Sequence, residues 1–276
     1  MQTKREKIRS VALIYVSVSL GLIVCFLVQK LSGIAVPRGV RGVANLTVGG
    51  LGALLVFPRL LKLPFGSVPL GEYCRRLGLY PFPPGAWKHV LLGLLLAACT
   101  VGGMLAGTLL TGKYQVDWRT VNVSQFVFSI GPGLWEETLF RGVLMMLLLQ
   151  WTRSLPRAVI FQVLLFGLGH LGGIDPWDLV DVGSVMLLAL AFTYTAHRTR
   201  SLLAGMVFHF LHDALVYLPQ LPGGKYTGFH DNMVFYLGLW GFLGVGCLLV
   251  WLASGPLGVR AEQPLYDLSR AGAASE

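Results

Sequence analysis

Long apolar runs dominate this chain of 276 residues and constrain its fold more than any other feature. An α-helix needs about 20 apolar residues to cross a hydrocarbon core about 30 Å thick. The runs lie at about 11–28, 43–57, 89–111, 124–150, 157–171, 179–197, 202–218 and 233–253. They lack the strict alternation of barrel strands, so we expect helices. The sequence therefore predicts an all-α, polytopic integral membrane bundle of about eight transmembrane helices.

The charged residues support this class and indicate an orientation. They make up 13% of the chain, about half the share of soluble domains, which excludes a water-soluble globule. The net charge of +9 lies mainly between the apolar runs, so we expect an anionic membrane leaflet as partner and no nucleic acid. Lys and Arg gather on the loops that share a side with the N-terminus. This distribution predicts an N-in/C-in, multi-pass protein of the inner (plasma) membrane, which we expect to be bacterial.

One membrane-embedded domain accounts for residues 1–253. Within it, 58–90 is rich in Pro, Gly, Arg and aromatic residues and is expected to be an interfacial connecting segment. The short, glycine-containing run 43–57 could be re-entrant instead of spanning. The remaining residues, 254–276, form a polar C-terminal tail. Gly-rich spans can pack within one chain or between chains, so the oligomeric state stays open.

Two adjacent carboxylates stand near the middle of the run 124–150. Glu136 and Glu137 each cost at least about 2.5–3.5 kcal/mol at mid-bilayer. Arg141 follows Glu137 by four residues and can pair with it on one helix face. Glu136 points about 100° away and lacks that partner. The simpler alternative is a structural ion pair with a spare carboxylate.

Imidazoles occupy two further runs. His170 ends the stretch Phe166–His170, and His209 and Asp213 share a helix face, with His212 between them. Each could be an ordinary polar contact between helices. Together with the Glu pair, however, they can be solvated only by facing one another or a wet cavity. A carboxylate there suits general-base work on water, which suggests amide hydrolysis inside the membrane.

These residues resemble the motifs of a known family. Glu136-Glu137-Thr-Leu-Phe-Arg141 matches the EExxxR motif of the CAAX-protease and bacteriocin-processing (CPBP) membrane proteins. Phe166–His170 matches their FxxxH motif, and His209–Asp213 matches their HxxxN/D motif. The order and spacing agree over roughly residues 70–218. The resemblance implies a helical intramembrane endopeptidase of glutamic type.

The resemblance also implies roles for these side chains. Glu136 and His170 would activate the attacking water, His209 and Asp213 would stabilise the oxyanion, and Glu137 and Arg141 would support the site. Many members of the family have Asn at the last motif position. An ionised Asp213 cannot donate a hydrogen bond to an oxyanion, so Asp213 must be protonated, orient His209 or lie outside the oxyanion hole.

Other readings stay open beside the protease. His170, His209 and Glu136 could form a three-ligand zinc site, although the HExxH motif is absent. We favour a metal-free site with no cofactor. A non-enzymatic membrane scaffold or immunity protein and a proton-coupled transporter are further alternatives. The expected partners are the lipid bilayer and a peptide or protein substrate in or at the membrane.

Overall fold

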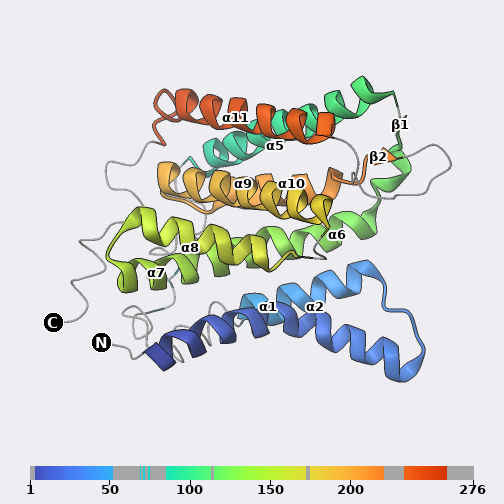
Figure 1. The fold of residues 1–276 in the computed structure, drawn as a ribbon, viewed down its shortest axis with the longest axis vertical. Helices are drawn as coiled ribbons and strands as arrows, with labels where there is room; N and C mark the ends of the chain where they lie inside the picture. The colour runs from blue at the N-terminus through green and yellow to red at the C-terminus, as the bar shows by residue number, and fades with distance from the viewer. Residues whose placement is uncertain are drawn as a thin grey trace.

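The computed structural model is a bundle of helices running back and forth (Figure 1). It describes residues 4–51, 69, 71, 74, 85–112, 115–171, 175–220 and 233–259. Its helices are α1 (Lys4–Ser32), α2 (Arg38–Leu51), α5 (Ala86–Thr111), η2 (Trp118–Thr120), α6 (Val123–Gly131), η3 (Pro132–Leu144), α7 (Met145–Thr152), α8 (Leu155–Leu168), α9 (Pro176–Thr199), α10 (Leu203–Leu215) and α11 (Met233–Ser254). Most of the expected interfacial segment 58–90 and most of the expected tail 254–276 lie outside the described residues.

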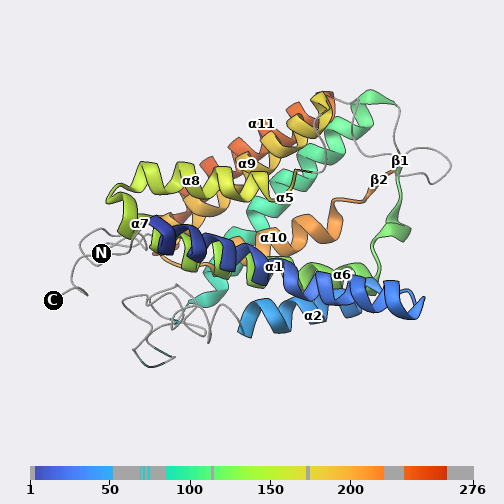
Figure 2. The same cartoon turned by 60° about the horizontal axis from the view of Figure 1, so that its bottom comes forward.

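The helices form layers that place α10 at the centre. α5 packs against α11 and α10, α8 packs against α9, and the α1–α2 hairpin covers α6 and η3 (Figures 1 and 2). α10 itself contacts α5, α6, α9 and η3. The strands β1 (Gln115–Val116) and β2 (Pro219–Gln220) pair antiparallel and join the segments that follow α5 and α10. A side chain on α10 can therefore meet side chains from most of the other layers.

The predicted helical class is confirmed. Within the described residues, three helices are long and apolar enough to cross a membrane: Ala86–Thr111, Asp178–Thr199 and Met233–Ser254. The helices α8 and α10 are shorter and apolar. α1 begins and α11 ends at the same end of the bundle, as N-in/C-in parity requires (Figure 1). The count of about eight spans and the orientation remain predictions.

The expected span 124–150 is one helical rod made of α6, η3 and α7. Asn122 caps its start, because the side-chain oxygen accepts a hydrogen bond from the Gln125 backbone N–H at 3.0 Å. Pro132 interrupts the i→i−4 ladder because it has no N–H to donate. From Pro132 to Leu144 the rod is a π-helix, a wider form that is enriched at functional sites. The rod thus changes its winding where the Glu pair lies.

The contact between α5 and α11 depends on glycines that face each other. A Cβ placed on Gly103 would lie 2.5 Å from the carbonyl oxygen of Gly238 and 2.4 Å from Cβ of Phe242. One turn further along, a Cβ on Gly107 would lie 2.8 Å from Cα of Phe235. Small residues let two helix backbones approach closely, which drives packing where lipid provides no hydrophobic contrast. This close crossing fixes α11 against α5, the helix that also packs on α10.

Gly103→Ala should destabilise the protein by about 1–3 kcal/mol, because the added methyl group overpacks the α5–α11 crossing. Gly102→Ala is the matched control, since a Cβ at Gly102 meets nothing within 4 Å. The control should be neutral or more stable by up to about 1 kcal/mol, the helix preference of Ala over Gly. Thermal unfolding in detergent measures both. Equal shifts for the two variants would contradict the close crossing.

Candidate active site

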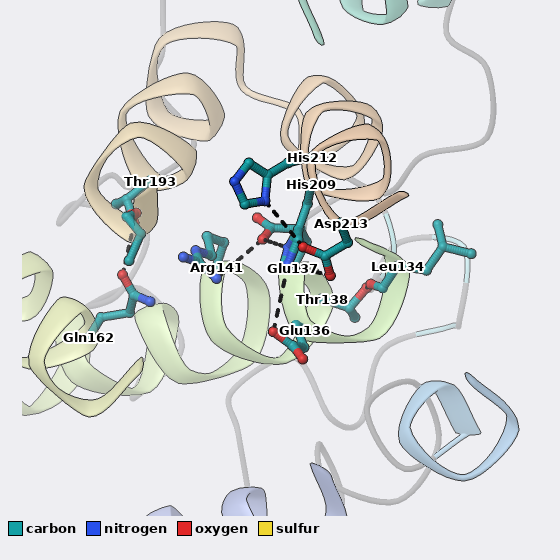
Figure 3. Close-up of polar contacts among 11 residues, drawn as sticks. Leu134, Glu136, Glu137, Thr138, Arg141, Gln162, Thr193, His209, His212 and Asp213 are labelled. Carbon is teal, nitrogen blue, oxygen red and sulfur yellow. Dashed lines mark hydrogen bonds and ion pairs between the residues drawn. The ribbon is translucent and has the colours of Figure 1, made fainter. Parts of the chain in front are cut away.

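The two adjacent carboxylates of η3 point to different places. The Glu136 side chain is 12% exposed and lines a cavity between η3, α8, α9 and α10. The Glu137 side chain is fully buried behind that cavity. Neighbouring positions on a helix face different directions, so one carboxylate can face a cavity while the other is enclosed by protein. Figure 3 shows the two carboxylates and their partners.

Glu137 joins its own helix to α10. Its Oε1 accepts a hydrogen bond from Nδ1 of His209 at 2.8 Å and lies 3.2 Å from a guanidinium nitrogen of Arg141 (Figure 3). The pairing of Glu137 with Arg141 confirms the prediction from their spacing. The Arg141 guanidinium is fully buried and lies over the rings of Phe166, at 4.1 Å, and Phe192, at 4.8 Å. Two aromatic faces and one carboxylate thus surround the buried cation.

Two glycines let η3 and α10 approach closely enough for this contact. A Cβ on Gly205 would lie 3.2 Å from Oε2 of Glu137. A Cβ on Gly133 would lie 3.0 Å from the backbone nitrogen of Phe210 and 3.1 Å from the carbonyl oxygen of Met206. Because larger side chains at either position would separate the helices, these glycines set the distance from Glu137 to His209.

His209 is the hub of the site. Its Nε2 lies 3.8 Å from Oε2 of Glu136 and 3.6 Å from Oδ2 of Asp213. Its ring stacks on Phe192 with the centroids 4.7 Å apart and an angle of 20° between the planes. With Glu137 at Nδ1, three carboxylates therefore surround one imidazole whose plane is held by an aromatic ring.

Asp213 is shared between two imidazoles. One carboxylate oxygen faces His209, and the other lies 3.3 Å from Nδ1 of His212. The backbone carbonyl of Asp213 accepts a hydrogen bond at 2.8 Å from the buried side-chain amide of Gln125 on α6. The end of α10 that carries Asp213 is thus tied to the start of the α6–η3–α7 rod.

His170 lies just beyond the end of α8. Its Nδ1 is 2.9 Å from the carbonyl oxygen of Phe166 one turn earlier, so the hydrogen-bond partner assigns the proton to Nδ1. In the neutral ring this leaves Nε2 as an acceptor. The His170 ring also packs on the Phe166 ring at 4.7 Å between centroids. One backbone carbonyl and one aromatic ring therefore set the tautomer and the direction of this imidazole.

The cavity has a volume of about 190 Å³ and gathers the motif residues. Its walls include Glu136, His170, His209 and Asp213, whereas Glu137 and Arg141 lie behind it. Sequence reasoning gave no role to several other residues of the wall, namely Gln125, Phe128, Phe192, His212, Val216 and Tyr217. Two of these residues could have been proposed from the sequence, because Gln125 is a polar residue inside an apolar run and His212 adjoins Asp213.

A comparison with protein families matches the segment that carries the site. Residues 118–215 match the model of the type II CAAX prenyl endopeptidase Rce1-like family. The chain is similar to this family over that segment. The matched segment runs from η2 to the end of α10 and contains every motif residue of the cavity. This family consists of peptidases, so the match indicates a peptidase, a hydrolase of peptide bonds. Comparisons with curated proteins and with solved structures found no match.

The metal-free site stays a prediction. Among the residues that the structure describes, no three His, Cys, Asp or Glu side chains are arranged to hold a metal ion. Nδ1 of His209 binds Glu137 and Nδ1 of His170 faces a backbone carbonyl, which leaves Nε2 as the second nitrogen of each ring.

Arg141→Met should destabilise the Rce1-like fold by about 3–5 kcal/mol, because it leaves the Glu137 carboxylate buried beside an apolar side chain. Glu137→Gln should restore part of this loss in the double variant, since the Gln oxygen still accepts the His209 hydrogen bond without a charge. Unfolding free energies of the four proteins in detergent give the coupling between the two positions. Strictly additive effects would show that the ion pair contributes no coupling.

Proposed function

We propose that this chain is an intramembrane endopeptidase in which Glu136 activates the attacking water with help from His170. The observation that supports this most strongly is the common cavity that Glu136, His170, His209 and Asp213 line. Charged and polar side chains inside membrane helices are costly, and here they converge on one small cavity. The family match favours the peptidase over the scaffold and the transporter.

Glu136 suits the role of general base. Its Oε2 is buried and makes no hydrogen bond within the described residues, so it can accept one from a water molecule in the cavity. A positioned base of this kind contributes typically about 10²–10⁴-fold to a rate. Nε2 of His170 provides a second acceptor at the wall of the same cavity. Two acceptors can hold one water with a lone pair directed at a carbonyl carbon.

In the proposed reaction, one proton moves from water to Glu136 and then to the amide nitrogen of the substrate. Glu136 takes one proton from water as the new C–O bond forms, and the carbonyl oxygen becomes an oxyanion. His209 stabilises that oxyanion from Nε2, and Asp213 holds the imidazole. The carboxyl group of Glu136 then returns the proton to the amide nitrogen as the C–N bond breaks. The products are a carboxylic acid and an amine, and the carboxylate is regenerated.

The size of the cavity limits the substrate. A volume of about 190 Å³ cannot admit a helix, whose diameter with side chains is about 10–12 Å. The segment that is cleaved is therefore extended, as in a peptide terminus or an unwound stretch of a membrane-associated or secreted protein. The matched family is named for CAAX prenyl endopeptidases, so a lipid-modified C-terminal peptide is the first substrate to test. We place the enzyme in a bacterial plasma membrane.

Glu136→Gln should reduce cleavage by at least about 10²-fold, because the amide keeps the shape but cannot accept a proton from water. The assay compares prenylated peptides, and the peptides of whole membranes, with wild-type and variant protein. Asp178→Asn is the matched control, since the Asp178 carboxylate only accepts a hydrogen bond from the Asp175 backbone N–H at the start of α9, away from the cavity, and its loss should leave activity unchanged. Cleavage by Glu136→Gln at the wild-type rate would refute the proposal.

Exhaustive chelation should leave peptide cleavage within about twofold of the untreated protein, because the proposed chemistry uses only side chains. Zinc content of the purified protein is measured in parallel by mass spectrometry. Activity that is lost on chelation and recovered with zinc would establish the metal-dependent alternative instead.

A further inference from the structure

The carboxylate of Asp213 lies between two imidazoles and uses one oxygen for each. Oδ2 lies 3.6 Å from Nε2 of His209, and Oδ1 lies 3.3 Å from Nδ1 of His212 (Figure 3). A carboxylate that faces two N–H donors is held in its ionised form, in which it only accepts hydrogen bonds. Asp213 therefore cannot itself donate a hydrogen bond to an oxyanion.

The N–H groups that face Asp213 belong to the two imidazoles. Nδ1 of His209 is committed to Glu137 at 2.8 Å, which leaves Nε2 as its single donor to the cavity. That nitrogen is also shared with Glu136 and Asp213. Oxyanion sites commonly combine several preorganised donors, so one shared N–H group leaves the developing charge poorly stabilised.

His212 has a ring nitrogen available for this purpose. Its side chain is 11% exposed and forms part of the same cavity wall as Glu136 and His170. Nδ1 faces Asp213, whereas Nε2 makes no hydrogen bond to any residue in the described part of the chain. The ring of Phe208 packs edge-on against His212 at 6.2 Å between centroids and restricts its rotation.

We propose that His212 donates the second hydrogen bond to the oxyanion from Nε2, and that Asp213 is a positioning residue for both imidazoles. The inference rests on the proposed function. His212 acts as an imidazolium that takes its second proton from solvent before water attacks; one N–H is directed at Asp213 and the other at the oxyanion, and neither proton is transferred in the reaction. The neighbouring carboxylate balances that positive charge, so the cavity gains a charge-assisted donor.

The first test compares two replacements of His212 in the purified full-length protein. His212→Leu removes the donor and should lower kcat by about 10²–10³-fold, with KM changed by less than about threefold. His212→Gln keeps an N–H group at the end of a side chain of similar length and should retain at least about 10-fold more activity than His212→Leu. His212→Met is a second donor-free variant if the leucine protein unfolds at a lower temperature in detergent.

The second test uses the neighbouring position. Asp213→Asn places a carboxamide donor next to the oxyanion, so it should raise kcat of His212→Leu by at least about 10-fold. A purely structural role of His212 predicts no such rescue. The same substitution in the presence of His212 should change kcat far less, because the donor is already there.

The outcomes separate the two proposals. If His212→Leu keeps kcat within about threefold while Glu136→Gln is inactive, His212 is not an oxyanion donor and the protease mechanism stands. A fall in kcat that neither His212→Gln nor Asp213→Asn relieves also overturns the role of His212. If Glu136→Gln remains active, the proposed function fails and the inference fails with it.

Discussion

The site depends on one fully buried carboxylate, that of Glu137. It accepts the 2.8 Å hydrogen bond from His209 on α10 and lies 3.2 Å from the Arg141 guanidinium on its own helix. A buried charge without partners would cost several kcal/mol, so this carboxylate holds η3 and α10 in one register. Gly133 and Gly205 permit the close approach that the contact requires. The positions of Glu136, Asp213 and His212 in the cavity follow from that register.

The two adjacent glutamates have different surroundings. Glu137 has a hydrogen bond and an ion-pair partner and stabilises the fold, whereas Oε2 of Glu136 has no hydrogen-bond partner in the described chain and faces the cavity. His209 lies between the two carboxylates, because its Nδ1 faces Glu137 and its Nε2 faces Glu136. In the proposed mechanism Glu137 is the charged support and Glu136 is the base, so two neighbouring residues take the two roles.

Much of the site could be predicted because ionisable groups in apolar runs have so few permissible surroundings. Glu136, His170, His209 and Asp213 lie on three different runs, yet each had to face a cavity or one another, and they do. The pairing of Glu137 with Arg141 followed from helical spacing. Gln125 and Tyr217 were not predicted to line the cavity. A single polar residue near a helix end is common and does not indicate a site, and the contacts of these two residues with the cavity depend on distant helices.

The sequence by itself determined the helical membrane class and the set of polar residues that must converge, because lipid solvates neither backbone groups nor charges. Only the tertiary structure decided which carboxylate of the pair faces the cavity, where the π-helix starts, and that Asp213 lies between two imidazoles. These features depend on the winding and separation of packed helices. A difference of one residue in winding turns a side chain by about 100°, and no local pattern specifies that rotation.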